Sequence, residues 1–306
     1  MYFPYLRGRQ FELIALREFA EETYQQDQKV IPIIEPVKQS MNSLKIAISK
    51  FKSFNFSFSL ILNPKVGELV GRQDIFDELS EDLDGANWKP AFIVTPTNSE
   101  AIHTYLSETD LSDVILIVDS SVDLTSEKVR ALLGDKKIEF LISDLQRINR
   151  KLKGIDKSLV KLSDSFQKQD KNADYKEKGA ELFSEEHLFY AEEGFTGYSD
   201  YTALSSEYTE GGTSPYAVVI HLTYLNSEQE IWIRHFTSES NDGQENVQGK
   251  FAEAVEKAIY FLDGADIHTQ ATEELRKYFH EEKYPGLGMI KKLSIKNHLE
   301  LVHTIL

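Results

Sequence analysis

The chain has 306 residues, with 50 Asp or Glu against 34 Lys or Arg, so its formal net charge is −16. This charge disfavours non-specific attraction to nucleic acid or to an anionic membrane, and bulk DNA or RNA is not expected as a partner. Cysteine is absent, which excludes a disulfide framework and a thiolate metal site. No apolar run approaches the roughly 20 residues of a membrane span, and the N-terminus lacks the layout of a secretory signal. We therefore expect a cytoplasmic protein with no membrane span.

Short apolar runs, separated by amphipathic stretches of helical length, divide the first half of the chain. They cover residues 2–6, 30–34, 59–62, 91–94, 114–118 and 140–143. Near-continuous apolar runs are typical of strands buried on both faces, and strands joined by crossover helices run parallel. The spacing of roughly 25 to 30 residues is one βα unit and predicts an α/β fold, a (β/α)8 barrel of the TIM type. A doubly wound sheet is the alternative.

The stretches between these runs are predicted helices. Apolar residues recur at helical spacing over residues 10–25, and further helices begin near residues 42, 74, 99 and 126, where Asn, Asp or Ser can act as an N-cap. A seventh strand is expected at 158–163 and an eighth at 198–203.

After Pro215 the period of the apolar residues changes to two, which is typical of strands. Residues 217–225 and 231–236 are separated by a polar loop, which predicts a β-hairpin. If that loop is symmetric about Glu228, His221 lies opposite His235 as a cross-strand pair.

Helices are predicted at 249–262 and around 299–306, beyond the hairpin. We find no linker rich in glycine or serine, so we expect one elaborated barrel domain over residues 1–306. Within it, residues 165–248 form an excursion that contains an aromatic rim and the hairpin.

Several strings of residues carry a resemblance to a known family. They begin at Tyr2, Val30, Asn63, Asn172, Gly194, Pro215 and Gly286. On these strings the chain resembles, over nearly its full length, a bacterial family of uncharacterised proteins that is related to the phage-type beta-protein family. Members are often encoded near mobile elements or beside a second small gene. The resemblance implies a phage-defence or mobile-element setting and a protein partner encoded nearby, but no established reaction.

Polar residues end the apolar runs of the predicted barrel. They are Glu35, Asn63, Asp119, Asp144 and Asp164. The carboxyl ends of parallel strands meet at one rim, where such barrels place their chemistry. Clustered carboxylates there can hold Mg²⁺ or share protons as an acid–base pair, whereas helix N-capping is the competing interpretation for each single residue. Glu35 is a poor N-cap and precedes a proline, which favours the catalytic interpretation for it.

Cations follow the first two predicted strands and would lie at the same rim. Arg7, Arg9 and Lys38 could bind phosphate or carboxylate there. A structural salt bridge from Arg9 to Glu12 or Glu35 is an equal alternative.

A second group of candidates lies in the excursion and the hairpin. His221 and His235 could bind a metal or exchange protons, but paired histidines in an apolar alternation more often form a hydrogen-bonded core. Aromatic rings beside carboxamide and carboxylate groups could hold a planar ligand such as a nucleobase, with simple packing of the excursion as the alternative. That aromatic group comprises Asn172, Asp174, Tyr175, Tyr198, Asp200 and Tyr201.

Two functions remain open from the sequence. The first is a Mg²⁺-assisted phosphoester or nucleotide hydrolase of a bacterial anti-phage defence or mobile-element system, with Arg9, Glu35, Asp144 and Asp164 as its catalytic residues. The second is a non-catalytic recognition or partner subunit of a two-gene defence operon. The sequence carries no zinc-protease, P-loop, Rossmann or nucleophile-elbow motif, so it does not decide whether the chain is an enzyme.

Overall fold

The computed structural model describes residues 1–144, 148, 152, 156–211 and 214–306. The chain folds into two compact units. The first consists of Met1–Leu13, Ala20–Ser163 and Glu186–Asp200, and the second of Ile14–Phe19, Asp164–Glu185 and Tyr201–Leu306.

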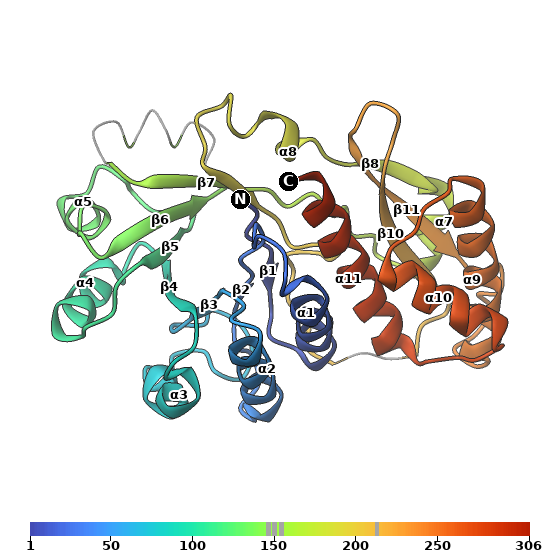
Figure 1. Cartoon of the computed structure of the whole chain (residues 1–306), viewed down its shortest axis with the longest axis horizontal. Helices are drawn as coiled ribbons and strands as arrows, with labels where there is room; N and C mark the ends of the chain where they lie inside the picture. Colours follow the sequence, from blue (N-terminus) through green and yellow to red (C-terminus); the bar gives the residue numbers. More distant parts are fainter. Residues whose placement is uncertain (145–147, 149–151, 153–155, 212–213) are drawn as a thin grey trace. The chain divides into compact units, whose positions relative to one another are not determined.

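The first unit contains a parallel eight-stranded sheet, counted over the described residues, in the order β1-β2-β3-β4-β5-β6-β7-β9. The strands are β1 (Tyr5–Leu6), β2 (Ile33–Ile34), β3 (Phe58–Ile61), β4 (Trp88–Val94), β5 (Val114–Val118), β6 (Ile138–Ser143), β7 (Ser158–Leu162) and β9 (Gly197–Ser199). A parallel bridge between Tyr2, just before β1, and Tyr198 of β9 links the two edges of the sheet and nearly closes it. The fold is therefore the TIM-barrel-like α/β fold that the sequence predicts (Figure 1).

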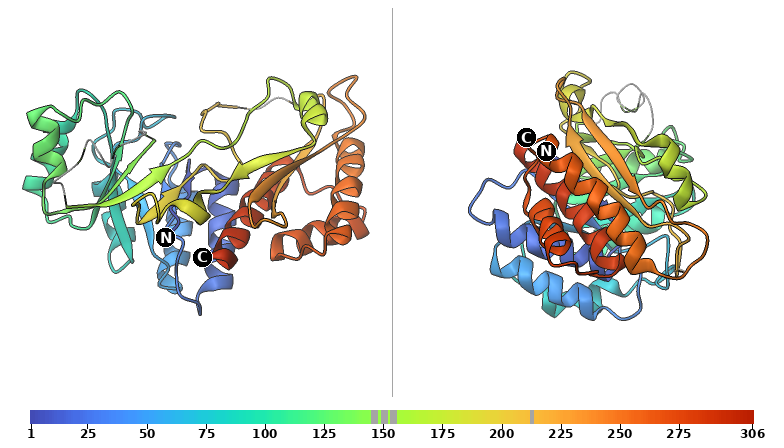
Figure 2. Two further views of the ribbon diagram at one scale, coloured as in Figure 1. Left: turned by 90° about the horizontal axis from the view of Figure 1, so that it is seen from above. Right: turned by 90° about the vertical axis from the view of Figure 1, so that its right-hand side faces the viewer.

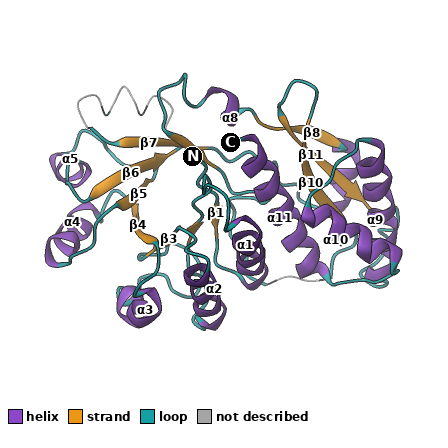
Figure 3. Ribbon diagram, viewed as in Figure 1, coloured by secondary structure: helices purple, strands orange, loops and turns teal. Residues whose placement is uncertain are grey.

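Helices follow the first five strands and cover the sheet (Figure 3). They are α1 (Gln10–Thr23), α2 (Asn42–Ser53), α3 (Ile75–Leu83), α4 (Ser99–Glu108) and α5 (Glu127–Leu133), while the short α8 (Glu186–Phe189) precedes β9. Each of α2 to α5 buries apolar residues at helical spacing; in α2 these are Leu44, Ala47, Ile48 and Phe51. This periodicity explains why the sequence locates these helices to within a few residues.

The parallel ladders fix which side chains share the carboxyl rim. In register, Ile34 pairs with Leu60, Val94 with Val118, and Ile117 with Ile142. The residues that follow these strands therefore emerge at the same end of the barrel, as predicted. They include Glu35, Asn63, Asp119 and Asp144.

The second unit contains an antiparallel sheet in the order β10-β11-β8. Its strands are β10 (Val219–Leu225), β11 (Ile231–Thr237) and β8 (Ala180–Ser184). The hairpin has the predicted register, with His221 opposite His235 and Tyr224 opposite Trp232. Before β8 lie a short 3-10 helix, η1 (Asn172–Asp174), and α7 (Tyr175–Lys178).

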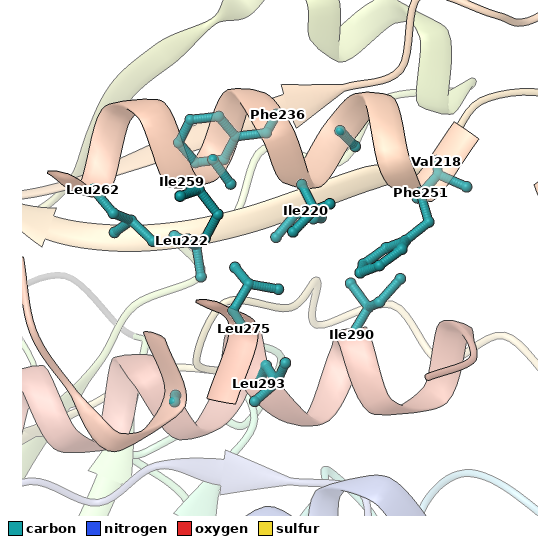
Figure 4. Packing of buried hydrophobic residues seen from close by; sticks show 14 residues of the cluster. Val218, Ile220, Leu222, Phe236, Phe251, Ile259, Leu262, Leu275, Ile290 and Leu293 are labelled. Carbon is teal, nitrogen blue, oxygen red and sulfur yellow. The ribbon is translucent and has the colours of Figure 1, made fainter. Parts of the chain in front are cut away.

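Three helices complete the second unit (Figure 2): α9 (Val247–Gly264), α10 (Gln270–His280) and α11 (Leu287–Ile305). They pack with the hairpin into one apolar cluster, in which Ile220 and Phe236 of the sheet meet Phe251 of α9, Leu275 of α10 and Leu293 of α11 (Figure 4). Among the described residues, no helix is long and apolar enough to cross a bilayer.

Helix α10 is not predicted from the sequence, and α11 begins earlier than the predicted last helix. The cap of α10 is a capping box made by Thr269 and Thr272, without the Glu or Gln that usually signals one. In α11 the buried face includes Lys292, Asn297 and His298, so its apolar periodicity is weak. Lys292 is fully buried and is neutralised by Glu18 at 2.9 Å and Glu274 at 2.5 Å.

Candidate functional site

Glu35 lies at the carboxyl rim and is fully buried. Its carboxylate accepts hydrogen bonds from the Tyr5 hydroxyl at 2.8 Å, the Arg7 guanidinium, and the backbone N–H groups of Lys65 at 2.6 Å and Val66 at 3.2 Å. A carboxylate has about four acceptor positions, so these donors use its hydrogen-bonding capacity. Glu35 therefore holds the loops after β1, β2 and β3 together, and Arg7 is the cation that forms an ion pair with it.

Glycines allow the same loops to approach closely. Gly67 has a φ of +84°, and a Cβ atom there would lie 2.5 Å from the carbonyl oxygen of Val37. Gly8, with a φ of +60°, is similarly close to the carbonyl oxygen of Glu35. Positive φ is accessible to glycine at little cost, which explains these residues at the rim.

Two carboxyl groups lie at the ends of the neighbouring strands β5 and β6. Asp119 forms an ion pair with Lys65 and accepts hydrogen bonds from the hydroxyl and N–H of Ser121. The pKa of Asp119 is lowered to about 2, mainly by the hydrogen bond from Lys65 and to a smaller extent by those from Ser121. Partial loss of hydration, and then the negative charge of Asp119, raises the pKa of Asp144. The rim therefore holds one strongly ionised carboxylate beside one that protonates more readily.

The other predicted rim residues have structural contacts. Asn63 exchanges two side-chain hydrogen bonds with the backbone of Ile93, at 2.8 and 2.9 Å, and so ties β3 to β4. Lys38 forms a half-exposed ion pair with Glu68 at 2.8 Å. Arg9 is the residue before α1 and makes no side-chain cap hydrogen bond.

Three further predicted acidic residues have contacts or positions of their own. Asp164 belongs to the second unit and accepts hydrogen bonds from the hydroxyl and N–H of Ser206. Asp174 is the last residue of η1. Asp200, which follows β9, is buried and accepts a hydrogen bond of 2.5 Å from the Tyr2 hydroxyl.

The histidine pair lies on the sheet of the second unit, enclosed by aromatic rings. The Nδ1 atoms of the two histidines are 2.7 Å apart, and Nε2 of His235 lies 3.3 Å from a carboxylate oxygen of Glu181. The Tyr175 ring is 4.8 Å from the His221 ring and 4.7 Å from the His235 ring, and Phe166 contacts both edge-on. The pKa of His221 is lowered to about 3, mainly by burial and to a smaller extent by the neighbouring His235. Burial also lowers the pKa of His235. Both rings are therefore neutral at pH 7.

The tautomers of the pair follow from Glu181. An ionised carboxylate only accepts hydrogen bonds, so Nε2 of His235 carries a proton and its Nδ1 is the acceptor. His221 must then donate from Nδ1, which leaves its Nε2 as an acceptor. The His221 ring also lines a cavity of about 250 Å³.

Two of the predicted residues line that cavity. Asn172, His221 and Ser294 line it, and Asn172 is fixed by a 2.9 Å hydrogen bond to the carbonyl oxygen of Ala217. The candidates Asn172, Tyr175, His221 and His235 are thus neighbours in the fold. Sequence reasoning does not find Glu181, because β8 carries no clear alternation of apolar and polar residues.

Metal binding has limited support from the geometry. Across the described ranges of the chain, no group of three or more His, Asp or Glu side chains is arranged to hold a metal ion. Asp119 and Asp144 at the rim remain a pair of oxygen donors of the type that Mg²⁺ prefers.

The fold and the charged rim define a TIM-barrel-like α/β protein with a second α/β unit. No family model matches the chain, and no curated protein matches it.

Proposed function

We propose that the chain is an enzyme that hydrolyses an anionic, phosphate-bearing substrate at the carboxyl rim of its barrel. One observation carries the proposal: Asp119 and Asp144 follow the adjacent parallel strands β5 and β6, with Lys65 paired to Asp119. The pKa of Asp119 is about 2, whereas that of Asp144 is raised. Neighbouring carboxyl groups whose pKa values are pushed apart commonly act as an ionised stabiliser and a proton carrier. The position of the pair agrees with the usual location of active sites in such barrels.

Two cations of the same rim would bind the substrate. The side chain of Lys65 is 47% exposed, and the side chain of Arg7 is 17% exposed. An ammonium and a guanidinium group at the same rim as the two carboxylates suit a phosphoester or nucleotide, whose phosphate they would orient. Asp144 would accept the proton of the attacking water as the bond from phosphorus to the leaving oxygen breaks, and would then give that proton to the leaving oxygen. Asp119 would keep Lys65 in position.

Mg²⁺ is compatible with this proposal but is not needed for the step assigned to Asp144. Asp119 and Asp144 are the residues that would hold it, because Mg²⁺ is often bound by one or two carboxylates together with substrate phosphates. When bound there, the ion would neutralise charge that develops on the phosphate.

The resemblance to the beta-protein group supports placing this activity in phage defence or in the biology of mobile elements, with a partner protein encoded nearby. A non-catalytic recognition subunit is the second candidate function. The observation that favours it is that hydrogen bonds use the acceptor positions of the Glu35 carboxylate, so that this predicted catalytic residue has a structural role instead.

The test is turnover of a panel of phosphoesters and nucleotides by the purified chain, with and without MgCl₂. We expect Asp144→Asn to lower kcat by about 100-fold or more, since general acid–base groups contribute about that much. Asp110→Asn is the matched control, because Asp110 is exposed and precedes β5 at the opposite end of the barrel. Absence of turnover by the wild type, or full activity of Asp144→Asn, would favour the recognition subunit.

A further inference from the structure

The second unit carries a groove between the end of β11 and helix α9, with a volume of about 860 Å³. Its lining includes three cations, Lys176, Arg234 and Lys257, and two carboxylates, Glu239 and Glu256. The lining is thus slightly cationic in a chain whose net charge is −16. Every residue that lines the groove belongs to the second unit, and its volume lies within the usual range for small-molecule sites.

Arg234 is the cation that remains available for a ligand. Its guanidinium carbon lies 4.5 Å from the centroid of the Phe261 ring, which holds the group in place from one side. Within the part of the chain that the structure describes, Arg234 forms no ion pair with a carboxylate. A guanidinium fixed in this way presents its N–H groups to an anion, and phosphate is an anion that it binds bidentately.

The two lysines differ from Arg234 because a carboxylate already pairs with them. Glu239 forms ion pairs with Lys176 and with Lys257, the latter at 2.6 Å, and these cations hold its pKa at about 2. Lys257 also donates to the carbonyl oxygen of Thr237 at 2.6 Å. This network forms a wall of the groove, and its carboxylate pairs with the two lysines rather than with Arg234.

Helix α9 adds an aromatic surface and a hydrogen-bond acceptor. Tyr260 lines the groove and is 85% exposed, a high value for a large ring. Glu256 precedes it by one helical turn, so both side chains lie on the same face of α9. Over the described ranges, no protein group donates a hydrogen bond to the Glu256 carboxylate.

We propose that this groove binds a nucleoside monophosphate whose base carries an exocyclic amino group. The base would stack on Tyr260 and donate an N–H to Glu256, and the phosphate would bind Arg234. Thr237 also lines the groove, and its buried hydroxyl has no hydrogen-bond partner among the described residues. The phosphate of such a ligand carries about −1.5 to −2 charges at pH 7, which suits a lining in which cations outnumber carboxylates.

The experiment measures binding of AMP, adenosine and inorganic phosphate by calorimetry. AMP is expected to bind at least 10-fold more tightly than either adenosine or phosphate alone. Arg234→Gln should weaken AMP about 10-fold and leave adenosine unchanged, because a charged hydrogen bond to phosphate is lost. Tyr260→Ala should weaken both AMP and adenosine, by about 10-fold, since stacking of the base is lost.

Inosine monophosphate tests the role of Glu256. It replaces the amino group of adenine by an oxygen, so it should bind more weakly than AMP, and Glu256→Gln should abolish that difference. Tyr216→Ala is the control for Tyr260→Ala and should leave AMP binding unchanged, because Tyr216 is also exposed, at 57%, but does not line the groove. Asp110→Asn, which removes an exposed carboxylate of the first unit, should leave AMP binding unchanged.

Each contrary result overturns the proposal. Equal affinity of AMP for the wild type, Arg234→Gln and Tyr260→Ala would place the nucleotide elsewhere. If phosphate bound as tightly as AMP, the groove would be an anion site that does not recognise the base. If AMP did not bind at millimolar concentration, the groove would not be a nucleotide site. Melting curves of all variants, expected to match the wild type, show that a lost affinity does not come from unfolding.

Discussion

The Nδ1 atoms of His221 and His235 lie 2.7 Å apart across the β10–β11 ladder, so a single N–H···N hydrogen bond joins the two neutral rings. Burial lowers the pKa of both, to about 3 for His221. The unfolded chain, with histidine pKa values near 6.5, therefore binds more protons than the folded chain does at acidic pH.

This difference predicts a loss of stability on acidification. The free energy of unfolding should be almost unaffected by the pair well above pH 6.5 and should fall below it, by about 2 kcal/mol at pH 5 for His221 alone. Urea unfolding of the wild type and of His221→Gln checks this, and the variant should show a shallower pH dependence between pH 6.5 and 5. Parallel curves for the two proteins would mean that His221 is protonated as readily in the folded state as in the unfolded one.

The tautomers form a second prediction. Nitrogen NMR of labelled histidine should find the proton of His221 on Nδ1 and that of His235 on Nε2, because Glu181 accepts from the latter. Glu181→Leu removes this acceptor and should allow the reversed arrangement to become populated. Glu177→Leu, one residue before the end of α7, is the control and should leave both resonances in place. Finding His221 protonated on Nε2 in the wild type would contradict the deduced chain of hydrogen bonds.

Glu35→Gln should destabilise the barrel. The substitution keeps the size of the side chain but leaves the Arg7 cation without its anion, and loss of one partner of a buried pair costs roughly 3 to 5 kcal/mol. For a unit of this size, the melting temperature should fall by roughly 6 to 20 °C. Glu68→Gln, at an ion pair whose side chains are 40% and 45% exposed, should change it far less. A normal melting curve for Glu35→Gln would show that the four-donor network is not needed for stability.

Gly67→Ala tests the close approach of the rim loops. The added Cβ would meet the Val37 carbonyl oxygen at 2.5 Å, in a backbone conformation with φ of +84°. We expect a loss of about 3 kcal/mol, from backbone strain of about 1 to 2 kcal/mol together with overpacking. Gly85→Ala is the matched control, since Gly85 has a φ of +68° but no atom within 4 Å of the added carbon. Chemical unfolding of both variants separates steric overlap from strain, and equal losses would argue against the close approach.

Sequence reasoning finds the barrel because its strands are buried on both faces and its helices on one, and both patterns are visible in the residue order. It also places His221 opposite His235, since a symmetric hairpin loop fixes the register. It does not find Glu181, whose strand pairs with the distant β11 and has no repeating pattern of its own.

The role of Glu35 at the rim could not be predicted from the sequence. Glu35 stands out in the sequence as a residue unsuited to capping a helix, but two of its four donors are backbone N–H groups of Lys65 and Val66. Their direction depends on the turn after β3, and no side-chain type at those positions encodes it. From the sequence alone, the same residue can therefore be a catalytic base or a structural anchor.

The closure of the barrel by β9 has a consequence for the synthesis of the protein. The residues that complete the sheet, Gly197–Ser199, pair with the segment around Tyr2 and Phe3, which lies at the other end of the barrel's sequence. During translation, both β1 and β7 therefore remain open edges until β9 has left the ribosome. Unpaired parallel edges can associate with other chains, so nascent chains that stall before this strand are the form of this protein most exposed to aggregation and to chaperone binding.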